Sequence, residues 1–220
     1  MNDIKLVDFI KIYDDALPHT ICDMIVNAFD ADDEYHEESF IGADYSDRKK
    51  HQLQKDHPNY DNHYRHAIEM NCVKRAETSP KWKNIVSFLN DNAVQQYRKY
   101  KQEMTDNGFP PYMLPDKIIL EDWRMHRYDV GKHFYKDHVD SIDTKSAQRY
   151  LAFSYYPVTV KEGGETAFAW HLKDVATKPK KGRLMIFPTW FGYPHEAKVP
   201  ISNNKYLIKT YLHYPGGPNA

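Results

Sequence analysis

Apolar residues recur at helical spacing in two segments of the first half of the chain. In the segment 18–29, residues on one face repeat every three or four positions; they are Ile21, Met24, Ile25 and Phe29. The segment 81–104 carries a longer apolar face, formed by Trp82, Ile85, Val86, Leu89, Ala93 and Tyr97. Three prolines in 107–115 end this second pattern. The sequence therefore predicts helices over 18–29 and 81–104.

The pattern changes from residue 117 onward. Short β-rich runs appear, separated by Gly, Pro and Asn; they read KIILEDWRMHRY, RYLAFSYYPVTV, ETAFAW, GRLMIFP and KYLIKTYLHY. Helices followed by many short strands are typical of an α+β, mainly β fold, with the helices on one face of the sheets. The chain has no internal repeat and no linker. We therefore expect one domain over 1–220, with helical support in 1–115 and a β core in 116–215.

One polar stretch, 44–68, fits neither the helical nor the β-rich pattern. It is rich in Asn, Asp, His and Pro and lacks a periodic apolar face. Loops of this length are often functional lids. We therefore interpret 44–68 as a long loop or surface flap.

Composition limits the classes of partner. The chain has 220 residues, of which 41% are hydrophobic and 28% charged, so a globular protein is expected. The net charge of −1 gives no electrostatic footprint for nucleic acid, so we expect no nucleic-acid partner. No run approaches the roughly 18 apolar residues of a membrane span, and no signal-peptide core is visible. We expect no membrane partner and a cytoplasmic location.

Candidate metal ligands come from the twelve histidines rather than from the two cysteines. Cys22 and Cys72 can form at most one disulfide and no CxxC pair occurs, so any metal site must use nitrogen and oxygen ligands. In a strand, His138 and Asp140 would point to the same face. Two histidines and one carboxylate form the facial triad of non-haem Fe(II) oxygenases. The His-x-Asp pattern alone is weak, because such residues more often belong to a solvated loop.

Four further segments, in a defined order along the chain, make the metal-ligand pattern more specific. They are RYDVGKHFYKDHVD (127–140), RYLAFSYYPVTVKEGGETAF (149–168), PKKGRLMIF (179–187) and HEAKVPISNNKY (195–206). In this order and spacing, they resemble the catalytic core of prolyl 4-hydroxylases, which are 2-oxoglutarate/Fe(II) dioxygenases. The segment 12–22, IYDDALPHTIC, resembles the start of the same family. The resemblance therefore spans nearly the whole chain.

The resemblance implies a fold and a metal site. The expected fold is a double-stranded β-helix, or jelly roll, whose larger sheet is supported by the N-terminal helices. The ligands of Fe(II) would be His138, Asp140 and His195. O₂ and 2-oxoglutarate would take the open positions, and ascorbate would serve as reductant. The resemblance implies no catalytic residue beyond the metal ligands.

The resemblance also implies a co-substrate pocket. Lys205, ten residues after the distal histidine, would bind the far carboxylate of 2-oxoglutarate, although Lys209 is an alternative. Tyr128 and Tyr156 would offer hydroxyl groups, and Thr166 would line the same pocket. Tyr211 stands where the family commonly has tryptophan and would keep an aromatic wall.

The implied reaction is hydroxylation, most simply of a prolyl residue in a peptide or protein, with release of succinate and CO₂. Trp190 and Phe191 are candidates for contacts with a proline-containing substrate. A free amino acid or other small molecule is an alternative substrate. A nucleic-acid demethylase of the same superfamily is disfavoured by the near-neutral charge. A non-catalytic jelly-roll binding module is the alternative of another class.

Overall fold

Antiparallel strands form two layers that face one another in this computed structural model, which describes residues 4–39 and 65–214. The major layer contains, in spatial order, β1 (Lys11–Tyr13), β10 (Arg183–Pro188), β7 (Arg149–Tyr156), β12 (Lys205–His213), β5 (Arg124–Tyr128) and β3 (Arg65–Asn71). Two short strands pair with its members, β2 (Glu37–Ser39) with β3 and β4 (Ile119–Leu120) with β12. The minor layer contains β6 (Phe134–His138), β11 (His195–Ala197), β8 (Thr166–Phe168) and β9 (Ala176–Thr177). The layers join where β3 pairs with β6. This double-stranded β-helix confirms the predicted fold class.

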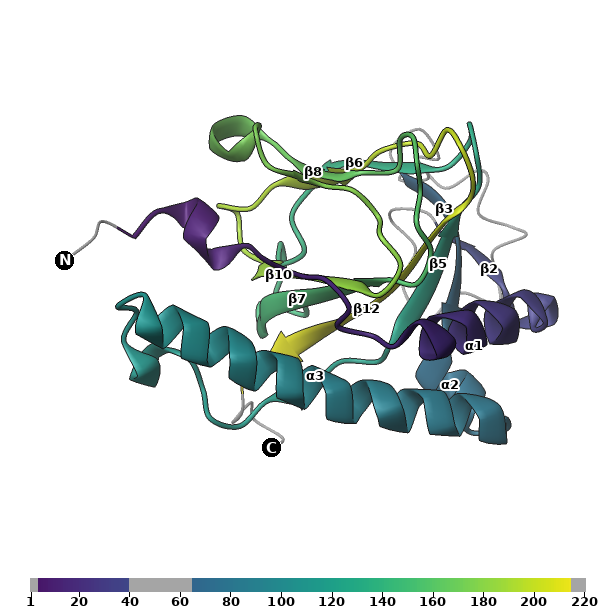
Figure 1. The fold of residues 1–220 in the computed structure, drawn as a ribbon, viewed down its shortest axis with the longest axis horizontal. Helices are drawn as coiled ribbons and strands as arrows, with labels where there is room; N and C mark the ends of the chain where they lie inside the picture. Colours follow the sequence, from purple (N-terminus) through teal and green to yellow (C-terminus); the bar gives the residue numbers. More distant parts are fainter. Residues whose placement is uncertain (1–3, 40–64, 215–220) are drawn as a thin grey trace.

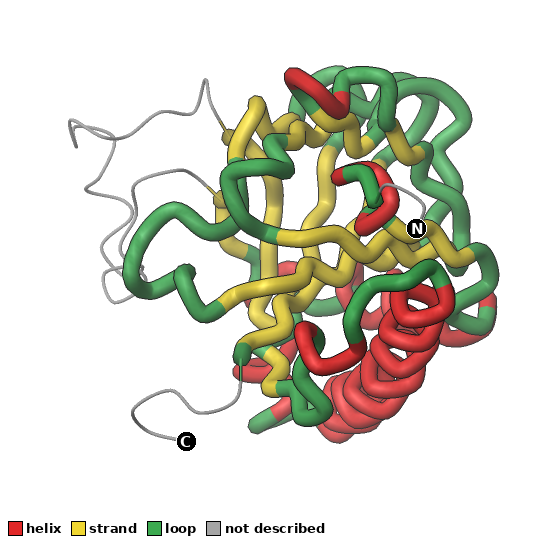
Figure 2. Tube along the Cα trace, turned by 90° about the vertical axis from the view of Figure 1, so that its left-hand side faces the viewer, coloured by secondary structure: helices red, strands yellow, loops and turns green. Residues whose placement is uncertain are grey.

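Three helices lie against one side of the major layer, opposite the minor layer (Figures 1 and 2). They are α1 (His19–Asp30), α2 (Cys72–Ala76) and α3 (Pro80–Asp106), and short 3-10 turns occur at Leu6–Phe9, Asp33–Tyr35, Pro111–Met113 and Trp170–Leu172. The start of α3 follows from local chemistry, because the Ser79 side chain accepts a hydrogen bond from the Trp82 N–H and Pro80 needs no acceptor. The helices predicted over 18–29 and 81–104 are confirmed within two residues at each end.

Alternation along the strands separates two apolar clusters. Between the helices and the major layer, Trp82 and Leu89 of α3 pack among buried residues that include Ile208 of β12. Between the two layers, a second cluster includes Leu207 and Tyr211 of the same strand. Successive residues of a strand point to opposite faces, so the odd-numbered positions of β12 face the space between the layers. That space contains the candidate site.

The N-terminal part contributes strands as well as helices. β1, β2 and β3 all come from 1–115, which the sequence interpretation assigned to helical support, and β3 pairs with both β5 and β6. Residues 65–68, interpreted as part of the polar loop, begin β3. The sequence hides this strand because two of its inward positions are charged, Arg65 and Glu69. The rest of the expected flap, 44–64, lies outside the described residues.

Two glycines with nearly equal backbone angles allow a matched stability test. Gly131 has φ +69° and open space around a would-be Cβ, whereas Gly163 has φ +71° and its Cβ would lie 2.5 Å from the Val199 carbonyl oxygen. Gly131→Ala is expected to lower the free energy of unfolding by about 1–2 kcal/mol through backbone strain. Gly163→Ala should cost about 1–3 kcal/mol more through overpacking. Urea unfolding measures both values, and equal losses would contradict the close contact.

Candidate metal and co-substrate site

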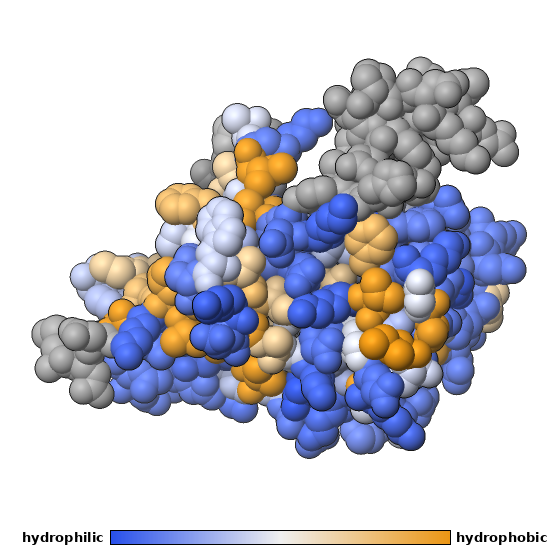
Figure 3. Space-filling view, turned by 90° about the horizontal axis from the view of Figure 1, so that it is seen from above, coloured by the Kyte–Doolittle hydropathy of each residue, from blue (hydrophilic) through white to orange (hydrophobic). Residues whose placement is uncertain are grey.

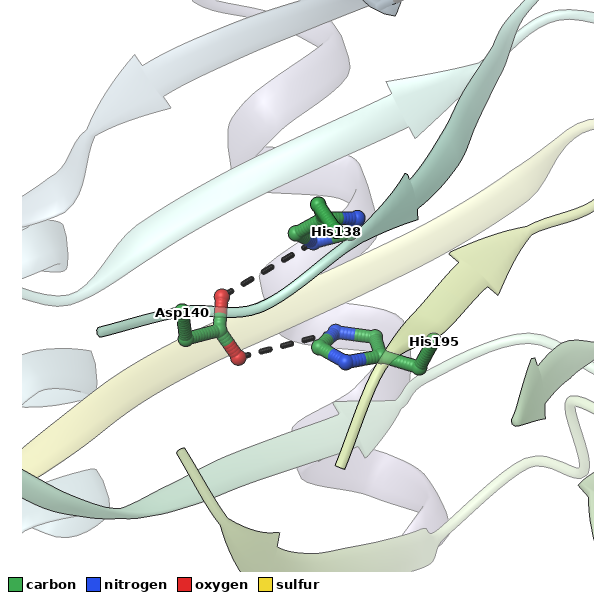
Figure 4. A group of neighbouring side chains, drawn as sticks. All are labelled: His138, Asp140 and His195. Carbon is green, nitrogen blue, oxygen red and sulfur yellow. Dashed lines mark ion pairs between the residues drawn. The ribbon is translucent and has the colours of Figure 1, made fainter. Parts of the chain in front are cut away.

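Three side chains predicted as metal ligands meet between the layers. His138 ends β6 and Asp140 follows two residues later, while His195 begins β11 directly opposite His138 in the strand pairing. The His138 Nε2 lies 3.8 Å from Asp140 Oδ1, and the His195 Nε2 lies 3.5 Å from Asp140 Oδ2 (Figure 4). One ligand atom from each residue lies within 4.8 Å of the others. The structure therefore brings the three residues into the spacing of a single cation site.

Backbone carbonyl groups fix the orientation of both imidazoles. The Nδ1 of His138 lies 2.8 Å from the Lys136 carbonyl oxygen, and the Nδ1 of His195 lies 3.1 Å from that of Tyr193. A carbonyl oxygen only accepts hydrogen bonds, so each neutral ring carries its proton on Nδ1. Each Nε2 therefore keeps a lone pair that faces the carboxylate of Asp140.

The electrostatics favour the protonation states that a metal requires. Burial lowers the pKa of His138 well below its ordinary value, and the nearby His195 lowers it further. Burial likewise lowers the pKa of His195. For Asp140, burial opposes ionisation, but the positive charge of Lys209 and the neighbouring histidines hold its pKa well below the usual range. Two neutral imidazoles and one ionised carboxylate fit the donor set of an open Fe(II) site.

A second group of polar side chains, those predicted to line the co-substrate pocket, lies around Lys205 of β12. Lys205 is fully buried and pairs with Tyr128 of β5. Its Nζ lies 3.3 Å from Thr166 Oγ1, and Tyr156 donates a 2.8 Å hydrogen bond to the same oxygen. The Lys205 Nζ also lies 5.3 Å from the Tyr128 ring centre and 5.8 Å from that of Tyr156. The structure therefore brings together four of the five residues predicted for the co-substrate.

Nearby negative charge compensates the buried positive charge of Lys205 only weakly. Burial lowers its pKa to about 7, although the charge of Glu165 acts in the opposite direction. A buried cation is costly unless an anion pairs with it. A carboxylate group is therefore the ligand that suits this end of the pocket.

The Lys205 pKa shift predicts how the stability of the ligand-free protein depends on pH. Its folded pKa of about 7 lies below the ordinary value of 10.5, so the unfolded chain binds more protons between these values. The cost of burying Lys205 is therefore complete below pH 7 and declines as pH rises toward 10.5. Compared with Lys205→Met, the wild type should be least stable at about pH 6 and nearly recover by about pH 10. Urea unfolding of both proteins measures this difference, and a constant difference would contradict the shift.

The fifth residue predicted for the co-substrate, Tyr211, lies beside the metal triad. Its hydroxyl group donates a 2.5 Å hydrogen bond to Asp140 Oδ1 and accepts a 2.7 Å hydrogen bond from the Lys209 Nζ. Lys209 also lies 3.9 Å from Asp140 Oδ1. The sequence interpretation considered Lys209 only as an alternative to Lys205. The two-residue alternation of β12 was the missed signal, because it puts Lys205, Lys209 and Tyr211 on one face.

Removing the Tyr211 hydroxyl group should weaken metal binding. Tyr211→Phe keeps the ring but deletes the hydrogen bond to Asp140 and the acceptor for Lys209. Partners that orient a metal ligand contribute about 10- to 100-fold in affinity, and we expect a loss in that range. Anaerobic Fe(II) titration measures it, with Tyr112→Phe as control because Tyr112 is 82% exposed. Unchanged Fe(II) affinity in Tyr211→Phe would contradict this role.

The predicted substrate contacts lie on the loop between β10 and β11. Phe191 is 76% exposed and Trp190 is 40% exposed, and their ring centres are 4.9 Å apart. The Thr189 carbonyl group of this loop accepts a hydrogen bond from the Ser141 N–H, next to Asp140. The face seen from above in Figure 3 carries several separate apolar clusters on a mainly hydrophilic surface.

The part of the chain that contains the site matches the model of a known family. Residues 123–213 match the model of the 2OG-Fe(II) oxygenase superfamily, and the match includes the triad and the Lys205 pocket. Over this segment, which is less than half of the chain, the sequence is similar to that superfamily. The predicted class of enzyme, a 2-oxoglutarate/Fe(II)-dependent dioxygenase, is thus confirmed at the level of the superfamily. The family implies Fe(II), 2-oxoglutarate and O₂, and the donor set described above fits the metal.

Solved structures with the same fold include three prolyl hydroxylases. A viral collagen prolyl hydroxylase from Paramecium Bursaria Chlorella virus-1, in complex with 2OG, is 20% identical with a TM-score of 0.59, covering 93% of this chain and 95% of its own. A Trichoplax adhaerens prolyl hydroxylase, in complex with a hypoxia inducible factor peptide fragment, is 14% identical with a TM-score of 0.62 and coverages of 94% and 84%. A Pseudomonas putida prolyl-4-hydroxylase is 14% identical with a TM-score of 0.57 and coverages of 94% and 93%.

No curated protein sequence matches this chain significantly. Within residues 4–39 and 65–214, no helix has the length and apolar character needed to cross a membrane.

Proposed function

We propose that this oxygenase hydroxylates a prolyl residue in a peptide or protein, with 2-oxoglutarate as co-substrate and release of succinate and CO₂. The observation that carries the proposal is the joint arrangement of the triad and Lys205. Two imidazole Nε2 atoms face one carboxylate, and a buried ammonium group lies farther along the same space between the layers. The structural likeness to prolyl hydroxylases supports the prolyl substrate.

Each residue has a defined task in this proposal. His138, Asp140 and His195 would hold Fe(II) as a facial triad and leave the remaining positions open. Together, bound Fe(II) and 2-oxoglutarate supply O₂ activation coupled to oxidative decarboxylation. The Nδ1 hydrogen bonds of both histidines keep the ligand atoms aimed at one point, and Tyr211 holds the carboxylate in place.

The Lys205 pocket would orient the co-substrate. The ammonium group of Lys205 would pair with the far carboxylate of 2-oxoglutarate, beside the Thr166 hydroxyl group. Tyr128 and Tyr156 close the pocket with their rings and exclude water, which strengthens the charge pair. Trp190 would offer its ring to the proline of the substrate.

Mass spectrometry of proline-rich peptides tests the substrate. After incubation with enzyme, Fe(II), 2-oxoglutarate and air, a gain of one oxygen atom on proline is expected, together with succinate. Oxygen gained by free amino acids and not by peptides would favour the small-molecule alternative. Absence of succinate with every substrate would favour a non-catalytic binding module. Ascorbate as reductant and the cytoplasmic location remain predictions.

A further inference from the structure

Two cations flank the metal triad, and the co-substrate pocket uses neither of them. The Lys209 Nζ lies 3.9 Å from Asp140 Oδ1 on one side. On another side, the Arg65 guanidinium lies 4.8 Å from the ring centre of Tyr135, and that ring stacks on His138 at 3.4 Å. β12 supplies Lys209 and β3 supplies Arg65, so the two charges come from different strands of the major layer.

Both cations are largely buried and keep donors to spare. The Lys209 side chain is 15% exposed and that of Arg65 is 18% exposed. Arg65 donates a 2.9 Å hydrogen bond to Glu69, but its Nε has no hydrogen-bond partner among the described residues. Lys209 has three N–H donors, and its one hydrogen bond to a described residue is to Tyr211. A buried donor without an acceptor is costly, so these groups suit an anionic ligand.

The sum of charges in the proposed complex also favours an anionic ligand beside the triad. Within it, Fe(II), the Asp140 carboxylate, dianionic 2-oxoglutarate and Lys205 neutralise one another. Asp140 is then no longer available to compensate Lys209. Glu69 lies 2.9 Å from Arg65 and 3.7 Å from a third cation, Arg124, so its single charge does not offset Lys209 as well. Positive charge is therefore left beside the metal, in a region where an unpaired buried charge is unfavourable.

We propose that the prime substrate, the molecule that is hydroxylated, presents a carboxylate to Lys209 and Arg65 beside the triad. This inference rests on the proposed function and names its substrate class. The guanidinium group suits a carboxylate because its N–H groups match the two oxygens, and the ammonium group adds a point charge. The carboxylate has two sources of equal chemistry, an acidic side chain next to the target proline or the α-carboxylate of a free amino acid.

Binding of matched probes tests the proposal without turnover. Anaerobic calorimetry with Fe(II) and 2-oxoglutarate compares N-acetyl-glycyl-aspartyl-prolyl-glycinamide with its asparaginyl counterpart, and L-proline with L-prolinamide. A carboxylate that meets both cations should bind at least about 10-fold more tightly than its amide, because hydrogen bonds to charged groups are strong. The pair that shows the preference identifies the source of the carboxylate.

Variants link that preference to the two cations. Lys209→Met and Arg65→Gln should each weaken binding of the preferred carboxylate probe by roughly 10- to 100-fold and leave its amide unaffected. Lys209→Arg should restore most of the preference. Lys83→Met is the matched control, since Lys83 is exposed on α3. Iron content is measured for every variant, so that metal loss is separated from substrate loss.

Three results would overturn the proposal: no carboxylate probe binds better than its amide, the preference survives in both variants, or the variants weaken only 2-oxoglutarate. The proposed function is judged separately by succinate formed without prime substrate, in the presence of ascorbate as the reductant. If the wild type forms succinate but shows no carboxylate preference, only the inference fails. If it forms none, the proposed function fails.

Discussion

His138→Ala is expected to weaken Fe(II) binding by more than about 100-fold, because losing a ligand should cost more than losing a residue that only orients one. The remaining residues, Asp140 and His195, offer the metal two ligands instead of three. Anaerobic calorimetry should show one Fe(II) per wild-type chain and no saturable binding in the variant.

The control for this experiment is another histidine. His19 has a side chain that is 58% exposed and lies at the start of α1, so His19→Ala should bind Fe(II) as the wild type does. Circular dichroism verifies that both variants are folded. Fe(II) binding by His138→Ala with wild-type affinity and stoichiometry would rule out the triad.

Lys205→Met should change stability in opposite directions with and without 2-oxoglutarate. Methionine fills a similar volume but removes a buried charge whose cost no described anion fully offsets. The ligand-free variant should therefore melt a few degrees higher than the wild type, since about 1 kcal/mol shifts Tm by about 2–4 °C at this size. The co-substrate then has no cation for its far carboxylate.

The same substitution should raise the 2-oxoglutarate concentration for half-saturation by about 100-fold or more, because breaking a buried charge pair costs about 3–5 kcal/mol. Saturating 2-oxoglutarate should therefore stabilise the wild type far more than the variant. Thermal unfolding with and without co-substrate measures both effects. Fe(II) affinity is the internal control and should change little. Equal stabilisation of the two proteins by 2-oxoglutarate would remove Lys205 from this role.

The sequence predicted the elements with strong apolar periodicity. The limits of α3 were predicted within two residues at each end because its apolar face repeats regularly from Trp82 to Tyr97 and prolines follow it. β3 was missed because Arg65 and Glu69 face the space between the layers, where charge replaces the usual apolar alternation. Polar inward positions are expected where a protein gives up core packing for a site.

The triad and the Lys205 pocket depended on motif order rather than on periodicity. His138 and His195 are far apart in sequence, and only the pairing of β6 with β11 brings them opposite one another. Arg65 was missed because no motif marks it. Lys209 was considered only as an alternative to Lys205, although strand alternation puts both on the inward face. The Tyr211 hydrogen bond to Asp140 depends on a side-chain rotamer and could not be read from spacing.

Succinate formation from 2-oxoglutarate tests the central claim most directly. Wild type and His138→Ala are incubated in air with Fe(II), 2-oxoglutarate and ascorbate as the reductant, and succinate is quantified over time. The account predicts steady succinate production by the wild type and only the background rate of free Fe(II) in the variant. The same succinate rate in both proteins would contradict the assignment of this site as the oxygenase centre.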